Sequence, residues 1–126
     1  MDVFKEYRFE AAHRLPEVPE GHPCGRLHGH GYRVVVTVSG PDDDTTGWVI
    51  DFAVIDNAFL PLREQLDHHM LNEIVGLENP TAERLAQWIW ERLAPELSGL
   101  SEITVWETAD AGCRVRAEDF QSPISS

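Results

Sequence analysis

The sequence reads His30-Gly-Tyr-Arg-Val-Val-Val-Thr-Val-Ser-Gly40 across its clearest strand. β-Branched and aromatic residues favour extended backbone, and this run is the strongest such signal in the chain. Residues 3–12 precede it and contain three aromatic residues, so they predict a first strand. Residues 15–27 hold three prolines and two glycines, a composition typical of a loop. The two strands therefore predict an antiparallel hairpin closed by a long loop.

Two helices are predicted in the middle of the chain. Asp51 is a suitable N-cap, and apolar residues follow it at helical spacing as far as Leu66. Pro61 lies inside that stretch and predicts a kink or an interruption of the helix. The second helix is expected after Pro80, with Thr81 as its cap and an apolar inner stripe.

Residues 103–108 and 113–117 predict two further strands that are joined by a turn. The element order is then ββααββ, which predicts an α+β domain with two antiparallel hairpins. We expect one domain over residues 1–120, since a chain of this length supports a single core. Residues 121–126 are expected to form a C-terminal tail.

The formal net charge of −12 argues against two classes of partner. Residues 1–33 hold as many basic as acidic side chains, so the acidic excess lies in the rest of the chain. Nucleic-acid binding and attachment to an anionic membrane rely on a basic surface, and neither is expected here. No apolar run approaches the about 20 residues that cross a bilayer, and no signal peptide is visible. With only two cysteines, a reducing cytoplasm is the expected location.

Three histidines are candidates for one metal site. His28 and His30 flank Gly29, and residues two apart in a strand face the same side, about 6–7 Å apart. His13 closes the first strand, so it falls opposite residues 28–30 if the two strands pair. Three imidazole ligands with an open fourth position are typical of a catalytic Zn²⁺ site, with Zn–N distances of about 2.0–2.1 Å. His22, inside the loop, is expected in solvent.

Cys24 leaves two interpretations open. As a fourth ligand in a Cys-x3-His-x-His arrangement it would close the site, and the protein would be a non-catalytic zinc module. As a thiolate beside the metal it would serve as a base or a nucleophile. The spacing alone favours neither interpretation.

Two carboxylates are also ambiguous. Asp67 and His68 follow the first helix, and such an adjacent pair favours a solvated helix end. Glu107 is expected on the same strand face as Ile103 and Val105, where an unpaired charge would be costly. It either binds a ligand with adjacent N–H donors or lies back in water at the strand end.

Six motifs follow one another along nearly the whole chain: Phe9-Glu-Ala-Ala-His-Arg-Leu15, Cys24-Gly-Arg-Leu-His-Gly-His30, Gly47-Trp-Val-Ile-Asp-Phe52, Leu66-Asp-His-His-Met-Leu-Asn72, Glu78-Asn-Pro-Thr81 and Val105-Trp-Glu-Thr108. Together they resemble those of the 6-pyruvoyltetrahydropterin synthase family. The resemblance is closest to the bacterial branch, the 6-carboxytetrahydropterin synthases of the queuosine pathway. Three residues separate Cys24 from His28, as in that branch, whereas the biopterin-pathway enzymes have a longer insert.

The resemblance implies the tunnelling fold, in which ββααββ subunits carry two helices on one face of an antiparallel sheet. The subunits join into a β-barrel trimer, and two trimers stack as a homohexamer. By position it implies these roles: Zn²⁺ ligands His13, His28 and His30; catalytic residues Cys24, Asp67, His68 and Glu107; substrate-binding residues Arg26, Thr81, Thr108 and Glu107. The family brings the cysteine and the Asp-His pair together across a subunit boundary.

The implied reaction is that of a zinc-dependent carbon–carbon lyase. It converts 7,8-dihydroneopterin triphosphate to 6-carboxy-5,6,7,8-tetrahydropterin and releases acetaldehyde and triphosphate. Formation of 6-pyruvoyltetrahydropterin by triphosphate elimination is the alternative within the family. A triphosphate needs basic partners in so acidic a chain, and the candidates are Lys5, Arg14, Arg26 and Arg33.

Overall fold

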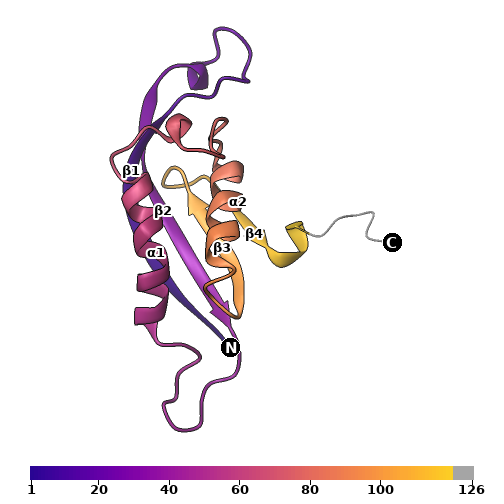
Figure 1. The fold of residues 1–126 in the computed structure, drawn as a ribbon. Helices are drawn as coiled ribbons and strands as arrows, with labels where there is room; N and C mark the ends of the chain where they lie inside the picture. The colour runs from indigo at the N-terminus through magenta and orange to yellow at the C-terminus, as the bar shows by residue number, and fades with distance from the viewer. Residues whose placement is uncertain (121–126) are drawn as a thin grey trace.

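Four antiparallel strands form one sheet, and two helices cover one of its faces (Figure 1). This is a computed structural model that describes residues 1–120, so the expected tail at 121–126 lies outside the described residues. The elements are β1 (Asp2–His13), β2 (His28–Ser39), α1 (Phe52–Leu66), α2 (Ala82–Leu93), β3 (Leu100–Trp106) and β4 (Gly112–Arg116). The predicted ββααββ order and α+β class are confirmed.

The sheet has the strand order β1-β2-β3-β4. β1 and β2 pair along their whole length, from Asp2 opposite Ser39 to His13 opposite His28. β3 and β4 form the second predicted hairpin. Pairing of β2 with β3 joins the two hairpins, and it brings the end of β3 towards the histidines of β2.

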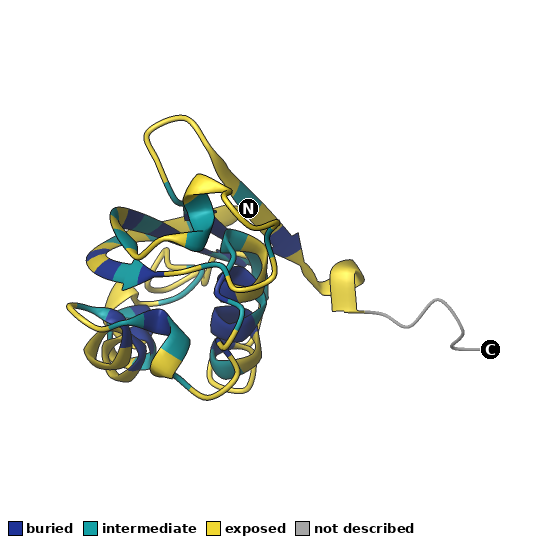
Figure 2. Ribbon diagram, turned by 90° about the horizontal axis from the view of Figure 1, so that it is seen from above, coloured by how far each residue is buried: buried dark blue, intermediate teal, exposed yellow. Residues whose placement is uncertain are grey.

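The core lies between the sheet and the helices (Figure 2). Alternate residues of β2 point inward, and all four are almost fully buried: Tyr32, Val34, Val36 and Val38. The helices meet them with the apolar faces that the spacing predicted, including Ile55 and Phe59 of α1 and Leu85 and Ile89 of α2. Each such side chain contributes about 1.5–3 kcal/mol by leaving water.

Pro61 does not interrupt α1, so that part of the prediction was wrong. The helix runs continuously from Phe52 to Leu66 with Pro61 inside it. Pro61 is exposed, whereas its neighbours Phe59 and Leu62 are buried against the sheet. Pro61 lacks the N–H that would bond to the Asn57 carbonyl, and because both residues are exposed, water is able to bond to that carbonyl instead. Packing on both sides of the proline holds the helix together.

Two strand boundaries matter for the site. β2 begins at His28, so this histidine is part of the strand and is paired with His13. β3 ends at Trp106, so Glu107 and Thr108 lie in the turn that leads to β4. Among residues 1–120, no helix combines the length and the apolar character that a membrane span needs.

Candidate functional site

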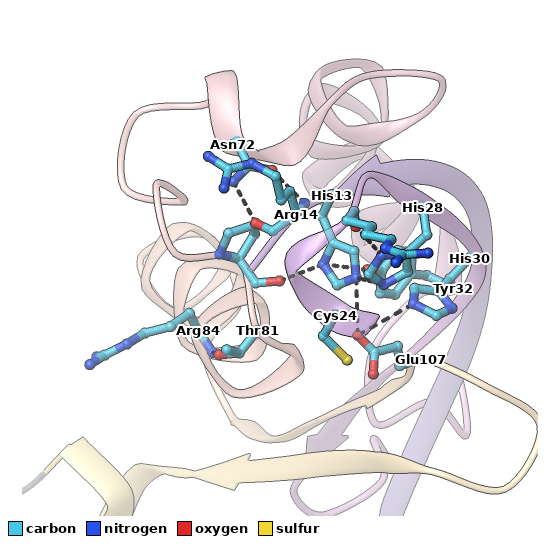
Figure 3. A network of polar contacts seen from close by, with 12 residues as sticks. His13, Arg14, Cys24, His28, His30, Tyr32, Asn72, Thr81, Arg84 and Glu107 are labelled. Atoms are coloured by element: carbon cyan, nitrogen blue, oxygen red, sulfur yellow. Dashed lines mark hydrogen bonds and ion pairs between the residues drawn. The ribbon is translucent and has the colours of Figure 1, made fainter. Parts of the chain in front are cut away.

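The three predicted histidines meet at one end of the sheet (Figure 3). Strand pairing sets His13 opposite His28, and His30 follows two residues along β2. The ring centroids lie 4.5 Å apart for His13 and His28, 5.0 Å for His13 and His30, and 4.9 Å for His28 and His30. One nitrogen of each ring lies within 4.8 Å of the others, so the three are positioned to bind a metal ion.

Backbone carbonyls orient two of the rings. His13 Nδ1 donates to the Pro80 carbonyl oxygen at 2.8 Å. His28 Nδ1 donates to the Arg26 carbonyl oxygen at 2.7 Å. Both rings therefore carry their proton on Nδ1 and present a lone pair on Nε2, as metal-binding histidines do.

The two Nε2 atoms of His13 and His28 lie 3.0 Å apart. Two lone pairs at that distance repel unless a cation lies between them. Nitrogens that share a tetrahedral ion with bonds of about 2.0–2.1 Å are separated by about 3.4 Å, so the observed spacing suits a common metal ion. Burial also lowers the pKa of His13, which is only 1% exposed, and favours the neutral ring that a metal requires.

Pro80 and Tyr32 complete the surroundings of His13, and neither was predicted from the sequence. Pro80 precedes α2 and reaches His13 only through the fold, with its carbonyl oxygen. Tyr32 is buried, and its hydroxyl lies 3.3 Å from His13 Nδ1. A carbonyl has no signature in a sequence, whereas the inward face of β2 could have indicated Tyr32.

Glu107 lies beside the histidines and not at a solvated strand end. Its Oε1 is 3.5 Å from His13 Nε2 and 3.8 Å from His30 Nε2, and its side chain is 27% exposed. Glu107 N–H donates to the Ala111 carbonyl oxygen, which fixes its backbone in the β3–β4 turn. A carboxylate in this position is able to accept hydrogen bonds from a ligand that enters beside the histidines.

Cys24 lies on a short 3-10 turn, Pro23–Gly25, in the loop between β1 and β2 (Figure 3). Its N–H donates to His22 Nδ1 at 3.1 Å, and its carbonyl oxygen accepts from Leu15 at 2.9 Å. In residues 1–120, the group of potential ligand atoms within 4.8 Å of one another contains the three histidines and not the Cys24 sulfur. This geometry favours an open three-histidine site over a closed four-ligand site. His22 is exposed, as predicted.

Asp67 and His68 form a pair at the edge of β1. Asp67 caps the C-terminus of α1, its Oδ1 accepts from Glu10 N–H at 3.0 Å, and His68 Nδ1 lies 3.0 Å from the same oxygen. The Glu10 N–H and then His68 hold the pKa of Asp67 below its ordinary value. His68 has a φ of 59°, an unusual value for a non-glycine residue, and its side chain is 77% exposed. The His68 ring therefore faces outward from a constrained backbone, whereas the Asp67 side chain is only 20% exposed.

The pair lines a pocket of about 440 Å³ that also includes Thr108. Neither Cys24 nor any histidine of the metal group lines this pocket. Within one chain, the structure thus brings together the three histidines and Glu107, whereas Asp67 and His68 line a different pocket.

Comparison with known proteins agrees with this arrangement. Residues 2–118 match the family model described as 6-pyruvoyl tetrahydropterin synthase. The chain belongs to this family of enzymes. A Synechocystis protein named 6-carboxy-5,6,7,8-tetrahydropterin synthase is 42% identical over 118 residues, which cover 89% of this chain and 90% of that protein. A Pyrococcus furiosus protein named dihydroneopterin monophosphate aldolase is 35% identical over 109 residues, covering 82% and 87% of the two chains.

The solved structures of the 6-pyruvoyl tetrahydropterin synthase family share the fold. The structure of the Caenorhabditis elegans 6-pyruvoyl tetrahydropterin synthase superposes with a TM-score of 0.85 and 24% sequence identity. The match covers 92% of this chain and 94% of that one.

Three further residues were predicted from the family resemblance to bind substrate. Thr81 caps α2, where its Oγ1 accepts from Arg84 N–H at 3.1 Å. Thr108 Oγ1 donates to Asp110 Oδ1 at 3.1 Å. Arg26 is exposed, and its carbonyl orients His28. These contacts are structural, so the contact of each side chain with a substrate stays a prediction.

Proposed function

We propose that this protein is a zinc-dependent 6-carboxytetrahydropterin synthase of queuosine biosynthesis in the cytoplasm. It converts 7,8-dihydroneopterin triphosphate and one water molecule to 6-carboxy-5,6,7,8-tetrahydropterin, acetaldehyde and triphosphate. The observation that carries the proposal is the group of three histidines, two of them oriented by backbone carbonyls, with Glu107 beside it. The 42% identity with the Synechocystis enzyme supports this branch of the family.

In this proposal His13, His28 and His30 hold Zn²⁺ through ring nitrogens. When bound, Zn²⁺ supplies a Lewis acid that polarises oxygens of the substrate side chain and acidifies the neighbouring C–H bonds. The carbonyls of Pro80 and Arg26 keep two of the imidazoles in the ligating tautomer. The half-buried position of His28 and His30 leaves the site open to a substrate.

Proton transfer is assigned to Cys24, Asp67 and His68. Cys24, as thiolate, removes a proton from the substrate side chain, and His68 relays protons. Asp67 orients His68 through the 3.0 Å contact with Nδ1, so the other ring nitrogen faces outward. The Glu10 backbone holds the pair from both sides, because its N–H donates to Asp67 and its carbonyl accepts from His68 N–H.

The working site is proposed to form between subunits of a homohexamer, built as a dimer of trimers. In one chain, the pocket lined by Asp67 and His68 includes neither Cys24 nor a histidine of the metal group. The sheet also has β1 and β4 at its edges, and open strand edges are normally paired or covered. Pairing β4 of one subunit with β1 of the next would close a barrel and cover both edges.

Glu107 is proposed to anchor the pterin ring by accepting hydrogen bonds from its N–H and amino groups. Glu107→Gln keeps the shape of the side chain but replaces one acceptor oxygen with an NH₂ group, which would then face an N–H donor of the pterin ring. We expect pterin binding to weaken on the order of 2–4 kcal/mol, with unchanged zinc content. Calorimetry with a dihydropterin measures this, and Glu102→Gln on β3, which removes the same charge outside the site, is the control. Equal affinity of the Glu107→Gln and parent proteins would mean that the ring is held elsewhere.

The proposed reaction is tested by product identification with dihydroneopterin triphosphate as substrate. We expect 6-carboxytetrahydropterin, acetaldehyde and triphosphate by mass spectrometry, in equal amounts. 6-Pyruvoyltetrahydropterin would assign the protein to triphosphate elimination instead. If no product forms and X-ray absorption shows sulfur at about 2.3 Å from zinc, the protein is a closed, non-catalytic zinc module.

A further inference from the structure

The loop between β1 and β2 forms a pocket of about 380 Å³, and its lining residues all lie between Arg14 and Arg26. Two arginines line it, Arg14 and Arg26, and Glu20 is its one carboxylate among the lining residues. Arg14 follows His13 directly, and Arg26 precedes His28 by two residues. The pocket therefore carries an excess of positive charge, and its two arginines are close in sequence to His13 and His28.

The two other basic candidates for a phosphate group are already paired. Lys5 Nζ lies 2.8 Å from Asp56 Oδ2. Arg33 lies 2.9 Å from Glu6 Oε1 and stacks over the ring of Trp106. The larger pocket beside His68 contains Arg33 with Arg8 and Arg63, and these two also contact carboxylates, Glu6 and Asp67 respectively.

Arg14 and Arg26, by contrast, form no ion pair among residues 1–120. Their guanidinium groups remain available to an anion. An anion that binds there need not displace a carboxylate, so its charge-assisted hydrogen bonds retain their full strength.

The backbone at both arginines is held in place. Arg14 N–H donates to Asn72 Oδ1 at 2.9 Å, and Asn72 Nδ2 donates back to the Arg14 carbonyl at 2.7 Å. Arg26 N–H donates to the Pro23 carbonyl at 3.1 Å, and the Arg26 carbonyl accepts from His28. The backbone of both arginines is thus fixed beside His13 and His28, so only the side chains remain to be ordered around a ligand.

The contacts also define an order across the site. Glu107 contacts His13 and His30 at one side of the group. His28 is bonded to Arg26 at the loop side. The proposed substrate has the same order, with a pterin ring at one end, a hydroxylated three-carbon chain in the middle and a triphosphate at the other end.

We propose that Arg14 and Arg26 form the triphosphate subsite of this enzyme. The inference rests on the proposed function, since the substrate defines which end is anionic. With the ring at Glu107 and the side-chain oxygens at the histidines, the triphosphate extends into the loop pocket. The subsite selects substrates with a phosphorylated side chain over the free pterin alcohol.

Equilibrium binding to the zinc-loaded Cys24→Ala protein tests the subsite without turnover. The two ligands are dihydroneopterin triphosphate and dihydroneopterin, which share the ring and side chain. Arg14→Gln and Arg26→Gln are each expected to weaken triphosphate binding about tenfold, and the double variant about a hundredfold. Dihydroneopterin affinity and zinc content should stay within about twofold of the parent, because the arginines contact neither the ring nor the metal.

Two control variants separate a subsite from a general effect of charge. Arg84→Gln removes an exposed arginine whose side chain contacts Gln87, and it should change neither affinity. Arg33→Gln removes a charge from the pocket beside His68. A larger loss of triphosphate affinity in Arg33→Gln than in the Arg14 and Arg26 variants would overturn the proposal.

Failure of the subsite and failure of the proposed function are distinguishable. If the parent binds both ligands and the Arg14 and Arg26 variants do too, with an unchanged ratio of affinities, the subsite is wrong and the function stands. If the parent binds neither ligand, both proposals are wrong. A selective loss of triphosphate affinity supports the subsite.

Discussion

Replacing His28 with alanine is expected to remove most of the bound zinc, from about one ion per chain in the parent, and to abolish activity. Two ligands would remain, and two imidazoles do not hold Zn²⁺ against a chelator. His28 is the suitable histidine to change, because its side chain is half-buried and is not part of the core. His13, in contrast, is buried and bonded to Pro80, so its loss would also disturb the core.

The measurement is metal content after dialysis against a mild chelator, with circular dichroism as the check on folding. His69→Ala is the matched control, since His69 is exposed and lies outside the metal group. It should keep the full zinc content. Undiminished zinc in a folded His28→Ala protein would rule out the three-histidine site.

The second large effect is expected for Cys24→Ala, which should keep its zinc and its oligomeric state but lose turnover by several orders of magnitude. Loss of a general base alone costs about 10²–10⁴-fold, and the relay through His68 then has no partner. The Cys24 sulfur lies outside the group of metal-ligating atoms, so its removal leaves the three ligands intact. Steady-state kinetics and metal analysis of the same sample measure both properties.

Cys113→Ala provides the control for removal of a thiol. Cys113 lies on β4, where its sulfur donates to the Ala82 carbonyl at 3.3 Å. Burial raises the pKa of Cys113 to about 11, so this thiol stays protonated at neutral pH and cannot act as a base. We expect nearly full activity. Loss of zinc in parallel with activity in Cys24→Ala would instead show that Cys24 is a fourth ligand.

The same variant tests whether the site is shared between subunits. Cys24→Ala and His68→Ala proteins should each be inactive alone. Hexamers reassembled from an equal mixture should recover about a quarter of the parent activity. At a shared site, Cys24 comes from one subunit and His68 from its neighbour, and with random assembly each of the two is intact in about half of the sites. No recovery in mixed hexamers would mean that Cys24 and His68 act within one chain.

Much of the local structure could be predicted from the sequence. Asp51 and Thr81 cap their helices as expected, since an N-cap bonds to a backbone N–H only two or three residues ahead. The valines of β2 alternate between core and outer face because the strand period is two. The histidine group was predictable for the same reason: His28 and His30 share a face, and His13 is brought opposite His28 by a hairpin between consecutive strands.

Other features depend on residues that are far apart in the chain. Pro80 orients His13 across 67 positions with a backbone carbonyl, a group that every residue possesses. Glu107 reaches the histidines only because β3 pairs with β2, and α1 continues through Pro61 only because its inner face is packed on both sides.

The pairing of the basic side chains with carboxylates also depends on the tertiary structure. Four basic residues were equal candidates for a phosphate in the sequence, and the fold pairs Lys5 with Asp56 and Arg33 with Glu6. Arg14 and Arg26 remain without such partners among residues 1–120. Sequence by itself determines which groups are present and what their nearest neighbours do, because short-range hydrogen bonds and strand periodicity are local. Tertiary structure decides which distant groups neutralise, orient or expose one another, because electrostatic and packing energies depend on distances that only the folded chain defines.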